Sequence, residues 1–166
     1  MSAKPTAASY TWDFKSEANT IFKDVQSDAR QALDHAGELQ SFTRDNNLSW
    51  KTHADQLEYL KSDIDDIGAK LCRLETIRRV VAPWQQHVID RIGTSVRLMA
   101  DNAQAAILFV NTNQNELRIP AYRDYLNNLY NEATTLTSSV GNAVEFASAS
   151  KEYRNLGHKL GVRASS

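Results

Sequence analysis

Apolar residues recur every three or four positions along four stretches of the chain, and no stretch alternates apolar and polar residues as a half-buried strand would. This spacing places apolar side chains along one face of a helix. The stretches run from about residue 12 to 45, 49 to 81, 83 to 113 and 120 to 156. The four apolar stripes are Ala18, Phe22, Val25, Ala29, Ala32, Ala36, Leu39; Trp50, His53, Leu57, Leu60, Ile64, Ile67, Leu71, Leu74; Ile89, Ile92, Val96, Met99, Ala103, Ala106, Val110; and Tyr122, Leu126, Leu129, Ala133, Leu136, Val140, Ala143, Ala147. The pattern predicts an all-α protein.

Turn and capping residues separate these stretches. Asp45-Asn46-Asn47 is a turn sequence, and Ser49 after it is a good helix N-cap. Pro120 suits the first turn of a helix, where its missing N–H is not needed. Each predicted helix would be about 45–55 Å long at about 1.5 Å per residue. Four rods of similar length with short links predict a long antiparallel four-helix bundle in up-down-up-down order, with the shallow crossing of coiled coils.

The link between the second and third stretches leaves a second architecture open. Residues 81–84, Val-Ala-Pro-Trp, contain no Gly, Asn or Asp. A proline inside a helix can kink the helix instead of ending it. The two stretches would then form one bent rod about 95 Å long at the same rise. That rod would expose both stripes and require a dimer.

A length of 166 residues suits one domain. We expect the bundle to occupy residues 12–158, between disordered tails at 1–11 and 159–166. The N-terminal segment lacks the charged start and apolar stretch of a signal peptide. The expected location is therefore cytoplasmic if Met1 is the native start, and periplasmic or secreted if a signal peptide has been removed.

Charge and apolar run length exclude two classes of partner. The 19 basic and 20 acidic side chains give a net charge of −1. A nucleic-acid binder needs a clustered basic excess to neutralise phosphates. The longest apolar run, 105–110, is far shorter than the roughly 20 residues of a membrane-spanning helix. We expect neither a nucleic-acid partner nor a membrane span.

The sequence contains none of the common catalytic or cofactor-binding motifs. There is no Glu-x-x-His pair for a di-iron site, no glycine-rich phosphate loop, no His-Glu-x-x-His and no Gly-x-Ser-x-Gly. The single cysteine, Cys72, excludes an intrachain disulfide and a Cys-based zinc site, and its place beside Leu71 predicts a thiol at the core edge. We predict a non-enzymatic protein with no catalytic, cofactor-binding or metal-binding residues.

One segment is apolar nearly all round its predicted helix. Between Ala103 and Val110 only Gln104 is polar, so Ile107, Leu108 and Phe109 cannot all face one core. An exposed apolar patch of this kind indicates a surface for a protein partner or a second copy of the chain. The alternative is that a loop or the N-terminal tail covers it.

Two smaller features have ordinary explanations beside functional ones. Lys151, Arg154, Lys159 and Arg163 form a basic C-terminal stretch, which suits a solvated helix end or a weak contact with an acidic partner. Each predicted helix also holds one interior glycine (Gly37, Gly68, Gly93 and Gly141). Three of them would lie at similar heights in the bundle, which suggests either a waist of close helix contact or chance.

The leading functional prediction is a helical bundle that acts by protein–protein contact, as scaffold, adaptor or assembly subunit. The alternative is a small-molecule-binding bundle of the sensor type, with a ligand held by polar groups such as Asn102, Asn127 and Asn131 and nearby tyrosines. A metal or cofactor enzyme is disfavoured by the residue spacing. Fold alone cannot choose among these classes, because bundles host many functions.

Overall fold

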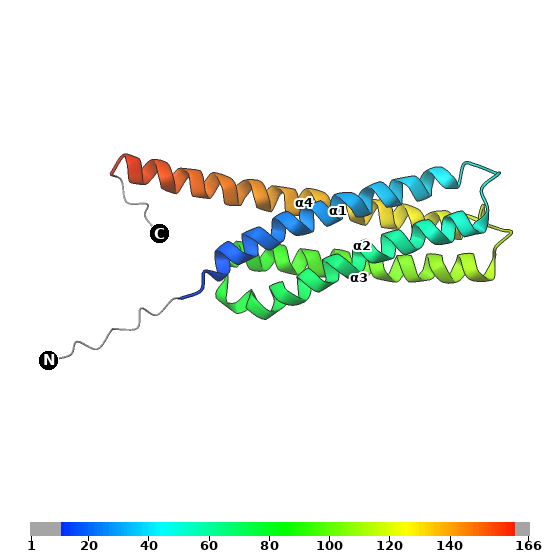
Figure 1. Ribbon diagram of the computed structural model, residues 1–166, viewed down its shortest axis with the longest axis horizontal. Coiled ribbons are helices and arrows are strands. Elements are labelled where there is room, and N and C mark those ends of the chain that lie inside the picture. Colours follow the sequence, from blue (N-terminus) through cyan, green and yellow to red (C-terminus); the bar gives the residue numbers. More distant parts are fainter. Residues whose placement is uncertain (1–10, 162–166) are drawn as a thin grey trace, which may run out of the picture.

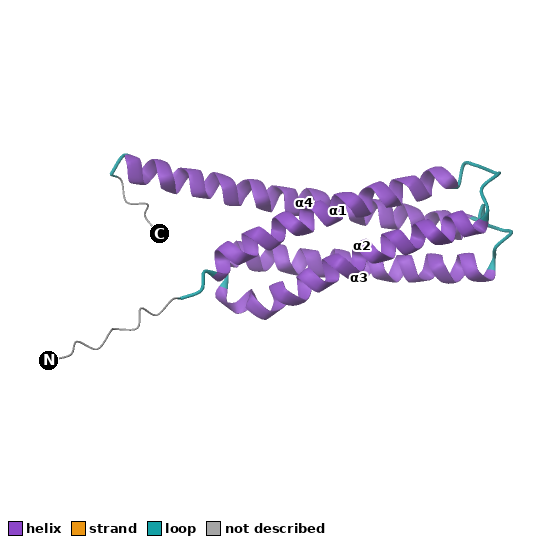
Figure 2. Cartoon of the chain, viewed as in Figure 1, coloured by secondary structure: helices purple, strands orange, loops and turns teal. Residues whose placement is uncertain are grey.

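The computed structural model describes residues 11–161, which form four α-helices and contain no strand (Figures 1 and 2). The elements are α1 (Phe14–Phe42), α2 (Trp50–Ile77), α3 (Pro83–Thr112) and α4 (Pro120–Lys159), with one 3-10 turn, η1 (Arg78–Val80). The predicted all-α class is confirmed over this range. Of the disordered tails expected at 1–11 and 159–166, residues 1–10 and 162–166 lie outside the described residues.

The helices pack around one core. α1 packs on α2, α2 on α3, α3 on α4, and α4 on α1, as in a four-helix bundle. Figure 1 shows the four rods lying side by side, with the connecting loops at the two ends. Each helix therefore has two neighbours within the bundle and one outward face.

The link between α2 and α3 breaks the helix. After η1, Val81 is extended, with φ −107° and ψ 171°, and α3 begins at Pro83. The side-chain amide of Gln85 accepts a hydrogen bond from the Ala82 N–H at 2.9 Å and so caps the start of α3. Since α2 and α3 also pack against each other, the chain does not continue through Pro83 as one rod.

Polar pairs between α1 and α2 run in opposite order along the two helices. Arg73 binds Glu17 through two bonds of 2.6 and 3.0 Å, and Lys70 pairs with Asp28. His35 contacts Asp63 at 2.5 Å. As the α1 residue number rises, the α2 number falls. Arg78 on η1 makes a similar two-pronged contact with Asp90 on α3, with bonds of 3.0 and 2.8 Å.

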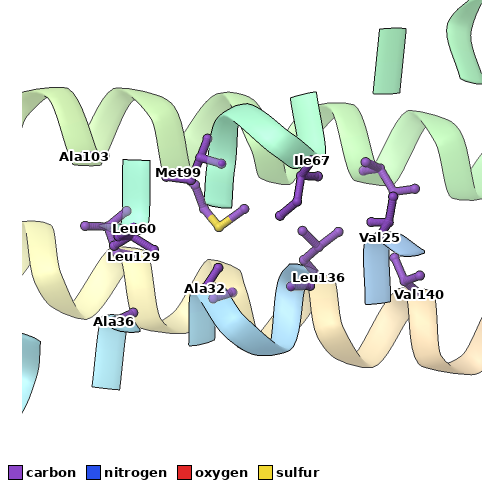
Figure 3. Packing of buried hydrophobic residues seen from close by; sticks show 14 of the residues in the cluster. Val25, Ala32, Ala36, Leu60, Ile67, Met99, Ala103, Leu129, Leu136 and Val140 are labelled. Carbon is purple, nitrogen blue, oxygen red and sulfur yellow. The ribbon is translucent and has the colours of Figure 1, made fainter. Parts of the chain in front are cut away.

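The predicted apolar stripes form the core. Figure 3 shows side chains from all four helices pointing toward the bundle axis, with Met99 between Ile67, Leu129 and Ala32. The α1 stripe is fully buried and includes the small residues Ala18, Ala29, Ala32 and Ala36. Small side chains let a neighbouring helix approach closely, which suits the packing of α1 on α2 and α4.

The structure departs from the predicted core at some stripe positions and at several polar positions outside the stripes. Leu71 and Val96 are only partly buried, whereas the polar residues Gln56, Asp63, Gln85 and Ser95 are buried. Gln85 is satisfied by α1, because its amide nitrogen donates to Lys15 O at 2.9 Å and Asn19 Oδ1 at 2.8 Å. The expectation of a thiol at the core edge is wrong, since Cys72 is exposed.

The glycines do not form a waist. A Cβ at Gly68 would meet nothing within 4 Å, and one at Gly93 would meet only Leu71 at 3.9 Å. We expect Gly68→Ala to stabilise the fold by about 0.5–1 kcal/mol, because alanine favours a helix over glycine. Urea unfolding measures this gain. Gly141→Ala is the matched control, since its Cβ would lie 3.0 Å from Gln26 Nε2 and should gain less. A loss of stability in Gly68→Ala would contradict the open surface at that site.

Candidate functional site

The C-terminal end of α4 extends past the start of α1 and the α2–α3 link (Figure 1). No residue from 148 to 161 is buried, so this end lies outside the core. It nevertheless carries large apolar side chains. The exposed fractions are 72% for Tyr153, 50% for Leu156 and 77% for Leu160, with Phe146 at its base exposed by 52%. We call residues 146–161 the α4 extension.

The apolar residues of the α4 extension repeat like those of a coiled coil. Phe146, Tyr153 and Leu160 are seven residues apart, and Leu156 falls between the last two. This is the spacing of a helix that packs against another helix. Phe146 contacts Trp84 at the start of this row, whereas Tyr153, Leu156 and Leu160 are exposed beyond it and form a stripe that no neighbour within residues 11–161 buries. The sequence pattern drew attention only to the basic residues of this segment, and the apolar stripe was not predicted.

Local sequence explains why α4 continues this far. The fourth apolar stretch was expected to end at about residue 156, but Gly157 lies inside the helix, and α4 ends at Lys159. Gly161 adopts φ +65°, the left-handed conformation that commonly follows a helix C-terminus. His158 and Lys159 in the last turn face the negative end of the helix dipole, which favours cations.

A groove between α3 and α4 begins where the α4 extension begins. Its volume is about 890 Å³. At its base the rings of Trp84 and Phe146 meet edge to face at 4.9 Å, and Trp84 also contacts the buried Phe22 at 6.2 Å. The groove is lined by Trp84, His87, Val88, Asp90, Arg91, Thr94, Ser95, Leu98, Glu132, Thr135, Ser139, Asn142, Ala143 and Phe146. Apolar and charged groups thus lie together on one outward face.

The three residues predicted as an interaction surface divide between core and solvent. Leu108 is 58% exposed on the outward face of α3. Ile107 and Phe109 are partly buried and pack against the core, and the Phe109 ring stacks on Tyr122 at 5.5 Å. The α3 segment therefore offers a single large exposed apolar side chain, a smaller patch than the α4 extension.

The asparagines considered for a ligand site lie on different seams of the bundle. Asn102 Oδ1 accepts a bond from Asn128 at 3.1 Å between α3 and α4. Asn127 Oδ1 accepts one from Gln40 at 2.9 Å between α1 and α4. Asn131 is exposed. The structure does not bring these three residues into one site.

A buried polar pair lies at the end of the bundle that holds the loops 43–49 and 113–119, which we call the loop end. His53 Nδ1 and the Tyr122 hydroxyl are 2.9 Å apart, and the Phe42 ring meets His53 edge-on at 5.7 Å. Burial lowers the pKa of His53 and raises the pKa of Tyr122. Both side chains are therefore neutral near pH 7 and share a hydrogen bond inside the core. The fold explains this pair, so we assign it no catalytic role.

His53 makes stability depend on pH. Its pKa in the fold lies below the 6.5 of an unfolded chain, so the unfolded state binds the proton more readily. Stability should therefore fall as pH drops below about 6.5. We expect His53→Gln to lose less stability than the wild type between pH 7 and pH 5 in urea unfolding. Burial raises the pKa of Asp63, with the opposite effect, but that contribution is common to both proteins. Equal pH dependence would contradict the burial of a neutral His53.

Comparison with protein-family models, curated proteins and solved structures found no match, so function is argued from this chain's own residues. Within residues 11–161 no three His, Cys, Asp or Glu side chains gather as metal ligands would. No helix in that range is long and apolar enough to cross a membrane. These findings define a four-helix protein in which one helix extends beyond the core and carries an exposed apolar stripe.

Proposed function

We propose that this is a non-enzymatic helical bundle that works through protein–protein contact, as a scaffold or assembly subunit. The observation that carries the proposal is the exposed stripe of the α4 extension. A helix that leaves its own bundle with Tyr153, Leu156 and Leu160 in water loses the stabilisation that burial would supply, about 25 cal/mol per Å² of apolar surface. Contact with another helix would bury these side chains and restore that stabilisation.

We also infer that the helices alternate in direction, up-down-up-down, as in an antiparallel bundle with coiled-coil-like packing. The opposed order of the Glu17–Arg73 and His35–Asp63 pairs supports this for α1 and α2. In that arrangement the α4 extension lies at the end that holds the α2–α3 link. The loops 43–49 and 113–119 lie at the other end.

A second copy of the chain is the partner that these surfaces suit best. From Ala147 to Leu160 the α4 extension is about 20 Å long, and the groove from Trp84 to Leu98 is also about 20 Å long, at about 1.5 Å per residue. Both begin at Phe146, so two copies related by a two-fold axis can each lay an extension against the other's groove.

Charges agree with this pairing. The α4 extension carries Lys151, Arg154 and Lys159 against Glu152, and is net positive. The groove is lined by two carboxylates, Asp90 and Glu132, and by one guanidinium, Arg91, and Asp90 is already paired with Arg78. When two α4 ends lie antiparallel, the basic end of one copy comes alongside the carboxylates of the other. Ion pairs at such flanking positions set the orientation of paired helices.

Sedimentation velocity across a concentration series tests this proposal. We expect a monomer at low micromolar concentration and a dimer at submillimolar concentration. The buffer should contain a reductant, or the protein should carry Cys72→Ser, because an exposed thiol can cross-link two copies. A monomer throughout the series would contradict self-assembly through α4.

The predicted contact at Ile107, Leu108 and Phe109 remains a second proposal of the same class. Its test is Leu108→Glu, which should abolish association if this segment forms the interface. A small-molecule-binding function is the alternative from a different class. The observation that favours it is a polar cleft at the loop end of the bundle, to which Asn127 contributes.

A further inference from the structure

Three arginines line one cleft at the loop end of the bundle. Arg44 lies in the α1–α2 loop, Arg118 in the α3–α4 loop and Arg123 near the start of α4. The cleft has a volume of about 440 Å³, within the usual size of small-molecule sites. Its remaining lining residues are Gln40, Thr43, Asn46, Leu126 and Asn127. No acidic side chain is among them.

The three guanidinium groups have no anionic partner within the part of the chain that the structure describes. Among residues 11–161, the ion pairs of the bundle use Arg73, Arg78, two lysines and His35, and none reaches Arg44, Arg118 or Arg123. Asp45, Glu116 and Asp124 are near in sequence but do not line the cleft. Three like charges at one cleft repel each other, and an anion between them would remove that repulsion.

The start of α4 adds to the positive potential. Arg118 and Arg123 flank the N-terminus of α4, which is the positive end of the helix dipole and has no acidic residue in its first turn. Ile119 at the N-cap supplies no side-chain acceptor to the free amides. Cations are unfavourable at this end of a helix, so Arg118 and Arg123 do not stabilise α4, and an anion bound between them would offset that cost.

Neutral donors complete the wall of the cleft. The Gln40 amide nitrogen donates to Asn127 Oδ1 at 2.9 Å, which fixes the two amides across the α1–α4 seam. The Asn127 amide nitrogen then has no protein acceptor among the described residues. Guanidinium groups bind phosphate and carboxylate oxygens through paired hydrogen bonds, and amide N–H groups add further donors.

We propose that this cleft, which we call the arginine cleft, binds a small multivalent oxyanion through Arg44, Arg118 and Arg123. The ligand class is a soluble molecule with two or more phosphate or carboxylate groups. Because the residues come from both loops and from α4, the bound anion joins three segments at this end of the bundle. The inference goes beyond the contact function proposed for α4 and does not depend on it.

Isothermal titration calorimetry with pyrophosphate and with citrate, each at matched ionic strength, tests the arginine cleft. We expect saturable one-to-one binding of at least one probe, and the stronger probe distinguishes a phosphate ligand from a polycarboxylate. Each single variant, Arg44→Gln, Arg118→Gln or Arg123→Gln, should weaken binding about tenfold or more, because a charge-assisted contact is lost. The triple variant should show no saturable heat.

The matched control is Arg30→Gln with Arg97→Gln, which removes two exposed arginines of α1 and α3 that line no part of this cleft. This variant should bind the probe as the wild type does. Circular dichroism melts confirm that every variant is folded. Absence of saturable binding for both probes, or equal binding by the triple variant and the control, would overturn the proposal. Sedimentation of the same variants should be unchanged, which separates this site from the α4 contact.

Discussion

Phe22→Ala should destabilise the protein by about 3–5 kcal/mol, a large part of the roughly 5–15 kcal/mol that holds a typical domain together. Phe22 is fully buried and is one of the largest side chains of the core. Its ring supports Trp84 at 6.2 Å, and Trp84 in turn supports Phe146. The substitution removes the apolar transfer energy and leaves a cavity at the end of the bundle from which α4 extends.

Urea unfolding followed by circular dichroism measures this loss. Lys23→Ala is the matched control, because Lys23 is the next residue of α1 and is exposed, so its effect should stay within about 0.5 kcal/mol. A cost below about 1 kcal/mol for Phe22→Ala would mean that Phe22 does not occupy a tightly packed core position.

Leu156→Glu should weaken self-association by about 30-fold or more, which corresponds to about 2 kcal/mol, because it replaces a large apolar side chain that the dimer buries. Leu156 lies on the exposed stripe between Tyr153 and Leu160, and a carboxylate there would be buried without a partner in the dimer. The folded monomer should be unaffected, because Leu156 lies beyond the last buried residue of α4, Ala143. Sedimentation velocity gives the dissociation constant, and thermal melts verify the fold.

Two matched variants locate the contact. Tyr59→Glu places the same charge at a residue of α2 that is 59% exposed, and it should leave association unchanged. Leu108→Glu tests the α3 segment in the same way. If Leu108→Glu abolishes association and Leu156→Glu does not, the interface lies on α3 and the role given to α4 is wrong.

The helical class and most core positions follow from the periodicity of apolar residues. All seven residues of the predicted α1 stripe are buried, and α3 and α4 begin at the prolines expected to start them. Periodicity succeeds here because the face that a helix buries is marked locally, by the spacing of the helix's own apolar residues. The ends were less accurate: α1 stops at Phe42, before the expected 45, because Thr43 and the Asp45 turn already bond back to its last carbonyls.

Buried polar residues could not be predicted in this way. Gln85 and Asp63 look like surface residues in the sequence, and they are buried because partners on α1 satisfy them. His53 is the exception, since its position on the predicted apolar stripe already indicated that it is buried. The partner of a polar side chain depends on the register between helices, which the sequence pattern does not give.

Neither candidate site could be assembled from the sequence alone. The α4 extension is recognisable only when the lengths of all four helices are compared in space, since its stripe continues that of the core without a break. The arginine cleft brings Arg44 together with Arg118 and Arg123, which come much later in the sequence. All three residues lie in or beside loops. A charge count along the chain gives −1 overall and hides such a cluster.

Native mass spectrometry of freshly purified, reduced protein, without chelator, reports the number of subunits and any retained ligand together, and so tests whether this protein acts by self-association. We expect a dimer at high protein concentration that Leu156→Glu converts to monomer, whether or not a small anion is retained. A wild-type protein that remains monomeric at every concentration while carrying a reproducible added mass would contradict self-association through α4, and would make ligand binding the primary function.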